Sequence, residues 1–322
     1  MKSKKLLLSG LHYPCTILRY FKWALEELGH TVWSSGPFCP TIPWRPELDY
    51  TKFVDVPNYI TPNGMPCWDS YDVLSECPFK PDAIISVDAG FYLAGANTHG
   101  IPNAVILTDP HSYAPPESTR YLESLDHYDL AAIMQQCYMP LYETSASGRK
   151  VPQIWIPYAA DTKRHFWNNT DFSNRQFDVM IISGQLYTNR LTALTAMAEA
   201  GLKVFQDSGI LFEDASNKYN ESVIAFNWSS EQDLCARFFE GLAMRNLVLT
   251  NRVPDMKLFP DLREDEHYVA FDSIDECVEK ACYYSKNRDV AWKIASRGYE
   301  AWKAGDHTYQ QRISSVLNIL LN

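Results

Sequence analysis

The sequence has 322 residues, of which 46% are hydrophobic and 21% charged, with a formal net charge of −10. This composition is that of a globular protein long enough for two domains, and it excludes a disordered chain or a fibre. The net negative charge disfavours nonspecific binding to a phosphate backbone, so we expect no nucleic-acid partner. Because no stretch of about 20 apolar residues occurs, we also expect no membrane span and a cytoplasmic protein.

Eight cysteines are present, without a C-x-x-C pair or zinc-ligand spacing. This pattern predicts reduced thiols and no metal site.

The first half of the chain opens like a doubly wound parallel sheet. Lys5–Ser9 is a short apolar run, Thr16–Leu28 has helical spacing, and Thr31–Ser34 reads as a second strand. Continuous apolar runs predict further buried strands; these are Asp82–Val87, Asn103–Leu107 and Gln153–Ile156. The stretch Pro37–Phe79 is rich in Pro, Asn and Trp and is expected to be a long irregular insertion with weak secondary structure.

The strand–helix pattern then starts a second time. Strands are expected at 177–182, 203–206, 222–227 and 247–250, and helices at 191–200, 235–243, 275–285, 291–304 and 310–321. The repetition predicts two Rossmann-like domains. We place them at residues 1–158 and 177–305, with a polar linker at 159–176 and a last helical segment at 306–322.

The segment Asn227–Thr250 carries the strongest chemical signal. A predicted strand ends in a Ser-rich loop that opens a helix, so Ser229 and Ser230 are expected to cap that helix and help to form an anion site at its N-terminus. Glu240 lies within the otherwise apolar helix, where a carboxylate can accept two hydroxyl hydrogens from one ribose. A solvated helix carboxylate is the alternative interpretation.

The sequence RFFEGLAMRNLVLT (Arg237–Thr250) resembles the R-x-F-E-x-L-A-x-x-x-x-x-L-T stretch of group-1 glycosyltransferases, most closely that of their spore-maturation CgeB-like branch. Three further segments resemble the same branch, and the resemblance spans roughly Val151 to the end of the chain; these segments are DVMIISGQLYTNR, FDSIDECVEKACYY and DHTYQQR. It implies an α/β protein of the GT-B fold, with two Rossmann-like domains facing each other across a cleft and a last helix that crosses back to the first domain.

The resemblance also implies an activity, the transfer of a sugar from a nucleotide-diphosphate sugar, with a UDP-sugar as donor and no cofactor. Glu240 would hold the donor ribose, while Arg190 and the amides after Gly184 would face the diphosphate without a metal ion. Ser229 and Ser230 would complete this anion site.

Arg237 would pair with the diphosphate or with Glu240, unless it is only a surface arginine. Gln232 stands where many retaining relatives carry a glutamate, although the resemblance otherwise favours retention of configuration.

Polar residues follow the predicted strands of the first domain, where the carboxyl ends of parallel strands gather ligands. Asp109 and His111 are the catalytic candidates, and His12, Tyr13 and Asp88 are candidates for acceptor binding. The alternative for Asp109 is turn formation, because Asp-Pro is a good turn dipeptide.

Other function classes stay open. One is a nucleotide-sugar-binding module of the same fold without turnover, and another is a sugar-nucleotide epimerase. A dehydrogenase is disfavoured because no G-x-G-x-x-G follows the first strand, where Gly10 stands alone. The acceptor is not identified by these motifs; a glycan, a protein and a small molecule are all compatible with them.

Overall fold

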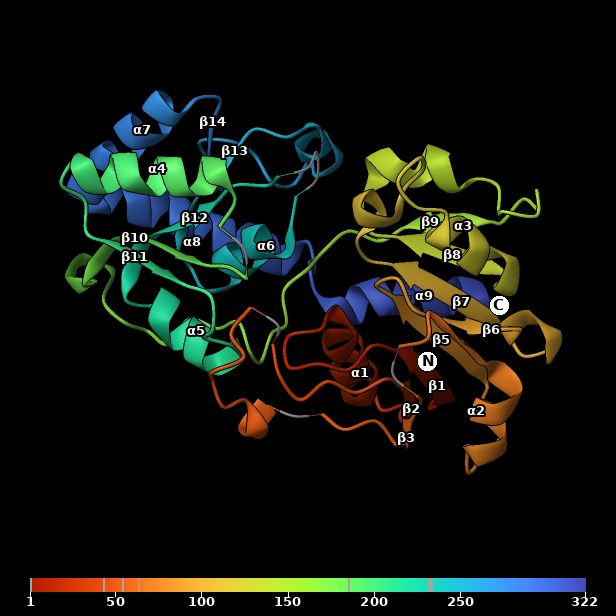
Figure 1. The fold of residues 1–322 in the computed structure, drawn as a ribbon. Coiled ribbons are helices and arrows are strands. Elements are labelled where there is room, and N and C mark those ends of the chain that lie inside the picture. Colours follow the sequence, from red (N-terminus) through yellow and green to blue (C-terminus); the bar gives the residue numbers. More distant parts are fainter. Residues whose placement is uncertain (1, 43, 54, 63, 185, 231–233) are drawn as a thin grey trace. The chain divides into compact units, whose positions relative to one another are not determined.

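The computed structural model describes residues 2–42, 44–53, 55–62, 64–184, 186–230 and 234–322. The chain divides into two compact units. The first contains Met1–Pro157 together with Tyr309–Asn322, and the second is Tyr158–Thr308. Each unit is a parallel β-sheet covered by helices (Figure 1). The segment predicted as a linker, 159–176, is counted within the second unit.

The first unit contains a sheet of strand order β3-β2-β1-β5-β7-β8-β9, with all neighbours parallel. Its strands are β1 (Lys5–Gly10), β2 (Thr31–Gly36), β3 (Tyr59–Ile60), β5 (Ala83–Asp88), β7 (Asn103–Leu107), β8 (Leu130–Ile133) and β9 (Gln153–Trp155). A small parallel pair is formed by β4 (Cys67–Asp69) and β6 (Tyr92–Ala94). Strands β5 and β7 are buried along their whole length, as expected for a sheet covered on both faces.

The helices of the first unit are α1 (Ile17–Glu27), α2 (Ser70–Glu76), α3 (Arg120–Ser124) and α9 (Tyr309–Leu321). The C-terminal helix α9 packs on α1, where the Tyr309 ring stacks on Tyr20 at 4.9 Å. The Gln310 side-chain amide donates a hydrogen bond of 2.6 Å to Glu27 Oε2. Helix α9 therefore completes the first unit, although it is the last element of the chain.

The second unit contains a parallel sheet of order β11-β10-β12-β13-β14. Its strands are β10 (Phe177–Ile182), β11 (Val204–Asp207), β12 (Ser222–Asn227), β13 (Leu247–Asn251) and β14 (Val269–Phe271). Its helices are α4 (Thr188–Glu199), α5 (Phe212–Tyr219), α6 (Ala236–Ala243), α7 (Ile274–Lys286) and α8 (Arg288–Ala304). A short 3-10 helix, η6 (Phe172–Asn174), precedes β10.

The segment Pro37–Phe79 has the weak secondary structure expected of it, in the short elements β3, β4 and α2. Two other expectations about local structure are wrong. Helix α4 begins at Thr188, so Arg190 lies in its first turn and not in the preceding loop. Helix α6 has Cys235 as its N-cap residue, so Ser229 and Ser230 do not cap it.

Helix α8 packs closely against the segment before β14, and this packing predicts how a substitution on α8 changes stability. A Cβ atom added at Gly298 would lie 2.2 Å from the His267 carbonyl oxygen and 2.9 Å from a Leu242 methyl. Overpacking of this kind typically costs about 1–3 kcal/mol. We therefore expect Gly298→Ala to lower the unfolding temperature of the second unit by several degrees in calorimetry.

Ser296 provides the matched control on the same helix. Its hydroxyl is buried, and no hydrogen-bond partner for it exists in the described part of the chain. Removing a buried hydroxyl without a partner is close to neutral or stabilising, so Ser296→Ala should leave the melting temperature unchanged or slightly raised. Equal melting temperatures for the two variants would contradict the packing argument.

Candidate functional site

The carboxyl edge of the second sheet has the topology of a ligand site. Strands β10 and β12 are neighbours, while β11, which lies between them in sequence, pairs on the other side of β10. The chain therefore reverses its winding direction between β10 and β12, and open α/β sheets bind ligands at such switch points. Ser183 and Gly184 follow β10 here, and Trp228 follows β12.

Two arginine side chains converge on this edge. Arg190 donates from Nε to the Trp228 carbonyl oxygen at 2.8 Å and from Nη1 to Ser183 Oγ at 3.2 Å. Arg237 donates from Nη2 to the same Ser183 Oγ at 3.0 Å and from Nη1 to Asn227 Oδ1 at 2.8 Å. Both guanidinium groups therefore donate to the Ser183 hydroxyl, directly after β10.

The charge of Arg237 is not neutralised by its direct contacts. Within the described residues, each of its hydrogen-bond acceptors is uncharged; they are Ile182 O, Asn227 Oδ1, Cys235 Sγ and Ser183 Oγ. No ion pair joins Arg237 to Glu240, which corrects that predicted pairing; Glu240 instead faces His165. A partly buried cation held by neutral acceptors favours the approach of an anion.

The serines after β12 lie on the same edge. The Ser229 backbone N donates to Asn251 Oδ1 at 2.7 Å, and Asn251 Nδ2 donates to the Ser229 carbonyl oxygen at 3.0 Å. Ser229 is buried and Ser230 is exposed. Residues 231–233, which include Gln232, lie outside the described residues, as does Gln185 next to Gly184.

Glu240 lies on α6, one helical turn beyond Arg237. Its Oε1 is 3.5 Å from His165 Nε2, and the Glu240 side chain is 19% exposed. The Asp161 backbone N donates to His165 Nδ1 at 3.1 Å, so Nδ1 is the acceptor and Nε2 carries a hydrogen toward Glu240. The sequence did not point to His165, because it lies in a polar stretch without periodicity that was interpreted as a linker.

The first unit also gathers its predicted residues at the carboxyl edge of its sheet. Strands β1, β5 and β7 are successive neighbours. His12 and Tyr13 follow β1, Asp88 ends β5, and Asp109 and His111 follow β7. Burial raises the pKa of Tyr13, so its hydroxyl stays protonated at neutral pH.

His111 has a defined tautomer. Its Nδ1 lies 3.2 Å from Gln135 Oε1, which can only accept, so Nδ1 carries the hydrogen and Nε2 keeps a lone pair. The Asp109 carboxylate accepts a hydrogen bond of 3.2 Å from the Thr108 hydroxyl. Both Asp109 and His111 are partly exposed, as groups that meet a ligand must be.

Two of the acceptor candidates are enclosed. His12 is 1% and Asp88 0% exposed. Burial lowers the pKa of His12 to about 4, which keeps its ring neutral. Asp88 Oδ1 accepts the Gly90 backbone N–H at 2.6 Å, so its carboxyl group shapes the loop after β5. The side chains at this edge that a ligand can reach are therefore those of Tyr13, Asp109 and His111.

The burial of Asp88 predicts a pH dependence of stability. Burial raises its pKa from 3.8 to about 7, so the native state holds a proton that the unfolded chain loses above about pH 4. The native state then binds more protons than the unfolded state in this window, and stability falls as the pH rises from about 4 to 7. We expect Asp88→Asn to remove this component. The melting temperature of the variant, relative to that of the wild type, should therefore rise as the pH increases from 4.5 to 8. A constant difference between the two proteins would reject the assignment.

Comparisons with known proteins bear on this arrangement. Residues 199–318 match a family described as glycosyl transferase-like. A search among curated proteins finds no significant match. Within the described residues, no helix combines the length and apolar character that a membrane crossing needs.

The whole chain is similar in fold to solved glycosyltransferase structures. Sucrose-phosphate synthase from Thermosynechococcus elongatus has a TM-score of 0.64 at 10% identity, with 98% of this chain and 99% of that chain covered. An α-glucosyltransferase solved with UDP-glucose and DNA has a TM-score of 0.67 at 12% identity, covering 99% and 100%. Anabaena HepE, solved with UDP-glucose, has a TM-score of 0.66 at 11% identity, covering 98% and 100%.

These findings confirm the predicted GT-B fold, and residues 199–318 match the glycosyl transferase-like family model. The narrower resemblance to the CgeB-like branch stays a prediction. Because the α-glucosyltransferase was solved with DNA, the fold itself gives no argument against a nucleic-acid partner.

Proposed function

We propose that this GT-B glycosyltransferase transfers a sugar from a UDP-sugar to an acceptor hydroxyl, with the donor bound at the carboxyl edge of the second sheet. The observation that carries the proposal is the meeting of two guanidinium groups at Ser183, beside the switch point of the sheet. Two structural neighbours were solved with UDP-glucose, which supports a UDP-sugar as the donor.

In this proposal the diphosphate lies against Arg190 and Arg237, close to the loop after Gly184 and to Ser229 and Ser230. Guanidinium groups bind phosphate oxygens bidentately and can supply the positive charge that a metal ion supplies in other enzymes. Donor binding should therefore need no metal. Glu240 would accept hydrogen bonds from the ribose hydroxyls, with His165 holding the carboxylate in place.

The acceptor would bind at the carboxyl edge of the first sheet. There Nε2 of His111 can take the acceptor's hydroxyl proton while Asp109 and Tyr13 position that hydroxyl. The bond between the sugar and the diphosphate breaks, a bond between the sugar and the acceptor oxygen forms, and UDP leaves with the bonding electrons. We propose retention of configuration, in line with the CgeB-like resemblance.

Turnover of UDP-glucose by the purified protein tests the proposal. Release of UDP should be measured with a panel of glycan, protein and small-molecule acceptors, in the presence of EDTA. We expect UDP binding and acceptor-dependent UDP release in EDTA. UDP binding without release for every acceptor would favour a binding module, and activity lost in EDTA but restored by Mn²⁺ would overturn the metal-independent mechanism.

A further inference from the structure

A second pocket lies in the second unit, at the edge of the sheet opposite the donor site. It has a volume of about 310 Å³, within the range of small-ligand sites. Its wall includes η6, which directly precedes β10, whereas the donor site follows β10. Because a strand rises about 3.3 Å per residue, the six residues of β10 separate the two sites by roughly 20 Å. A donor nucleotide cannot occupy both.

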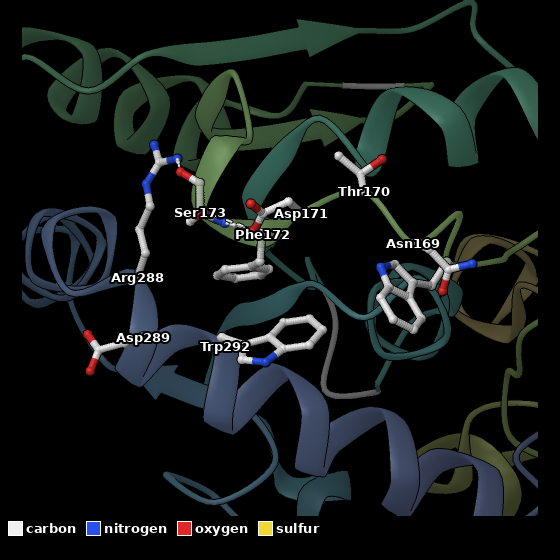
Figure 2. Close-up of a pocket in the computed structure, with 9 residues that line it drawn as sticks. Asn169, Thr170, Asp171, Phe172, Ser173, Arg288, Asp289 and Trp292 are labelled. Atoms are coloured by element: carbon white, nitrogen blue, oxygen red, sulfur yellow. Dashed lines mark hydrogen bonds between the residues drawn. The ribbon is translucent and has the colours of Figure 1, made fainter.

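The pocket has an aromatic wall. The Phe172 and Trp292 ring centroids are 5.2 Å apart, and the Trp167 ring lies 5.8 Å from Trp292. Figure 2 shows the tilted Phe172 and Trp292 rings one above the other, with Arg288 toward one end and Asn169 toward the other. Flat apolar rings with polar groups at both ends match a pyranose sugar, which has apolar C–H faces and a rim of hydroxyls.

The wall is held in place by contacts with two arginines. The Arg245 guanidinium lies 4.3 Å from the Trp167 ring centroid and 4.9 Å from that of Trp292. Arg288 fixes the segment around η6 by donating to the carbonyl oxygens of Ser173 and Arg175 at 2.8 and 2.9 Å. A pocket fixed before the ligand arrives does not spend binding free energy on ordering its wall.

Polar groups at the pocket retain hydrogen-bonding capacity. The Trp167 indole N–H is buried, and within the described residues it has no hydrogen-bond partner. Asn169 is exposed and lines the pocket in the left-handed backbone region, with φ of 64°, so its amide is open to a ligand.

We propose that this pocket is a second saccharide-binding site, which holds a pyranose unit of an acceptor or product glycan remote from the donor. The aromatic wall takes the apolar face of the sugar, and the Asn169 amide forms hydrogen bonds with its hydroxyls. The inference rests on the proposed function, since an enzyme that modifies a glycan binds it more tightly when it has a second site for it. Two-point attachment raises the effective concentration of the glycan at the enzyme.

The test uses the full chain saturated with UDP, so that the trisaccharides cannot occupy the nucleotide part of the donor site. Binding that the pocket variants weaken is then binding at the pocket and not at the acceptor site. Binding of maltotriose, cellotriose and chitotriose is measured by isothermal titration and saturation-transfer NMR. The variants are Trp292→Leu, which removes the aromatic wall, and Asn169→Gly, which removes the amide but tolerates the left-handed backbone. Tyr283→Ala, on an exposed tyrosine of α7 outside the pocket, is the matched control.

We expect at least one trisaccharide to bind the wild type and the control equally. Trp292→Leu should weaken that binding at least tenfold, and Asn169→Gly should weaken it about fivefold, as for one lost hydrogen bond. If Trp292→Leu does not fold, as judged by its melting temperature, Asn169→Gly decides. The absence of binding for all three sugars, or binding that neither variant weakens, overturns the proposal.

Failure of UDP to bind would count against the proposed donor site and not against the pocket, because the sugar titrations can be repeated without UDP. Transfer activity with UDP-glucose but no trisaccharide binding would leave the proposed function intact and remove the second site. The two proposals therefore fail separately.

Discussion

A His111→Ala variant is expected to lose about 10²–10⁴-fold in kcat while keeping the dissociation constant for UDP nearly unchanged. His111 is held by Gln135, whose Oε1 accepts from Nδ1 at 3.2 Å, so Nε2 is the basic atom and is fixed in direction. In the proposed reaction this atom meets the acceptor hydroxyl, whereas UDP binds the second unit. The expected result is therefore a large change in turnover with little change in nucleotide binding.

His99→Ala is the matched control for this prediction. His99 belongs to the same unit, but it precedes β7 and so lies toward the amino edge of the sheet, where its Nε2 pairs with the Ser70 hydroxyl at 2.7 Å. Single-turnover rates and UDP titrations on both variants separate the chemistry from binding. Equal damage to UDP binding and turnover in His111→Ala, or no damage to either, would place the catalytic group elsewhere.

The fold was predictable where the chain carries long, buried or strongly periodic segments. Strands β10 and β12 begin and end where expected, because their apolar runs are bounded by polar loops. Strand β8, with sequence LAAI, was missed, since two alanines give little β signal and its pairing with β7 and β9 makes it a strand. Strand β14 has only three residues, and its pairing with β13 likewise makes it a strand.

The candidate site was predictable only in part. Residues that follow strands could be identified as site candidates, because the carboxyl ends of parallel strands lie at one edge of the sheet. Contacts between distant segments were not: His165 meets Glu240 across 75 positions of sequence, and no local pattern reports such a pairing. The start of α6 was predicted to within one residue, but its cap was assigned wrongly, because the serines after β12 resemble a cap whereas the Ser229 backbone bonds Asn251 of the neighbouring strand.

The second prediction concerns the donor. We expect Glu240→Gln to weaken binding of UDP or UDP-glucose by about 10- to 150-fold, because a hydrogen bond to a charged acceptor contributes roughly 1.5–3 kcal/mol. Glutamine keeps the size of the side chain but replaces one carboxylate oxygen by an amide NH₂, so it cannot accept both ribose hydroxyl hydrogens. Isothermal titration with the two nucleotides measures the loss directly.

Glu300→Gln is the control, since Glu300 is a carboxylate of the same unit whose side chain is 62% exposed and pairs with Arg245 on the surface. Its donor affinity should equal that of the wild type, because exposed ion pairs contribute little and this one lies on α8, away from the carboxyl edge. A titration with uridine and with UDP sharpens the result further. If Glu240 binds ribose, the substitution should weaken uridine and UDP by the same factor. A loss confined to UDP would instead mean that Glu240 acts through the arginines that face the diphosphate, and an unchanged affinity for both, in a folded variant, would reject a ribose contact.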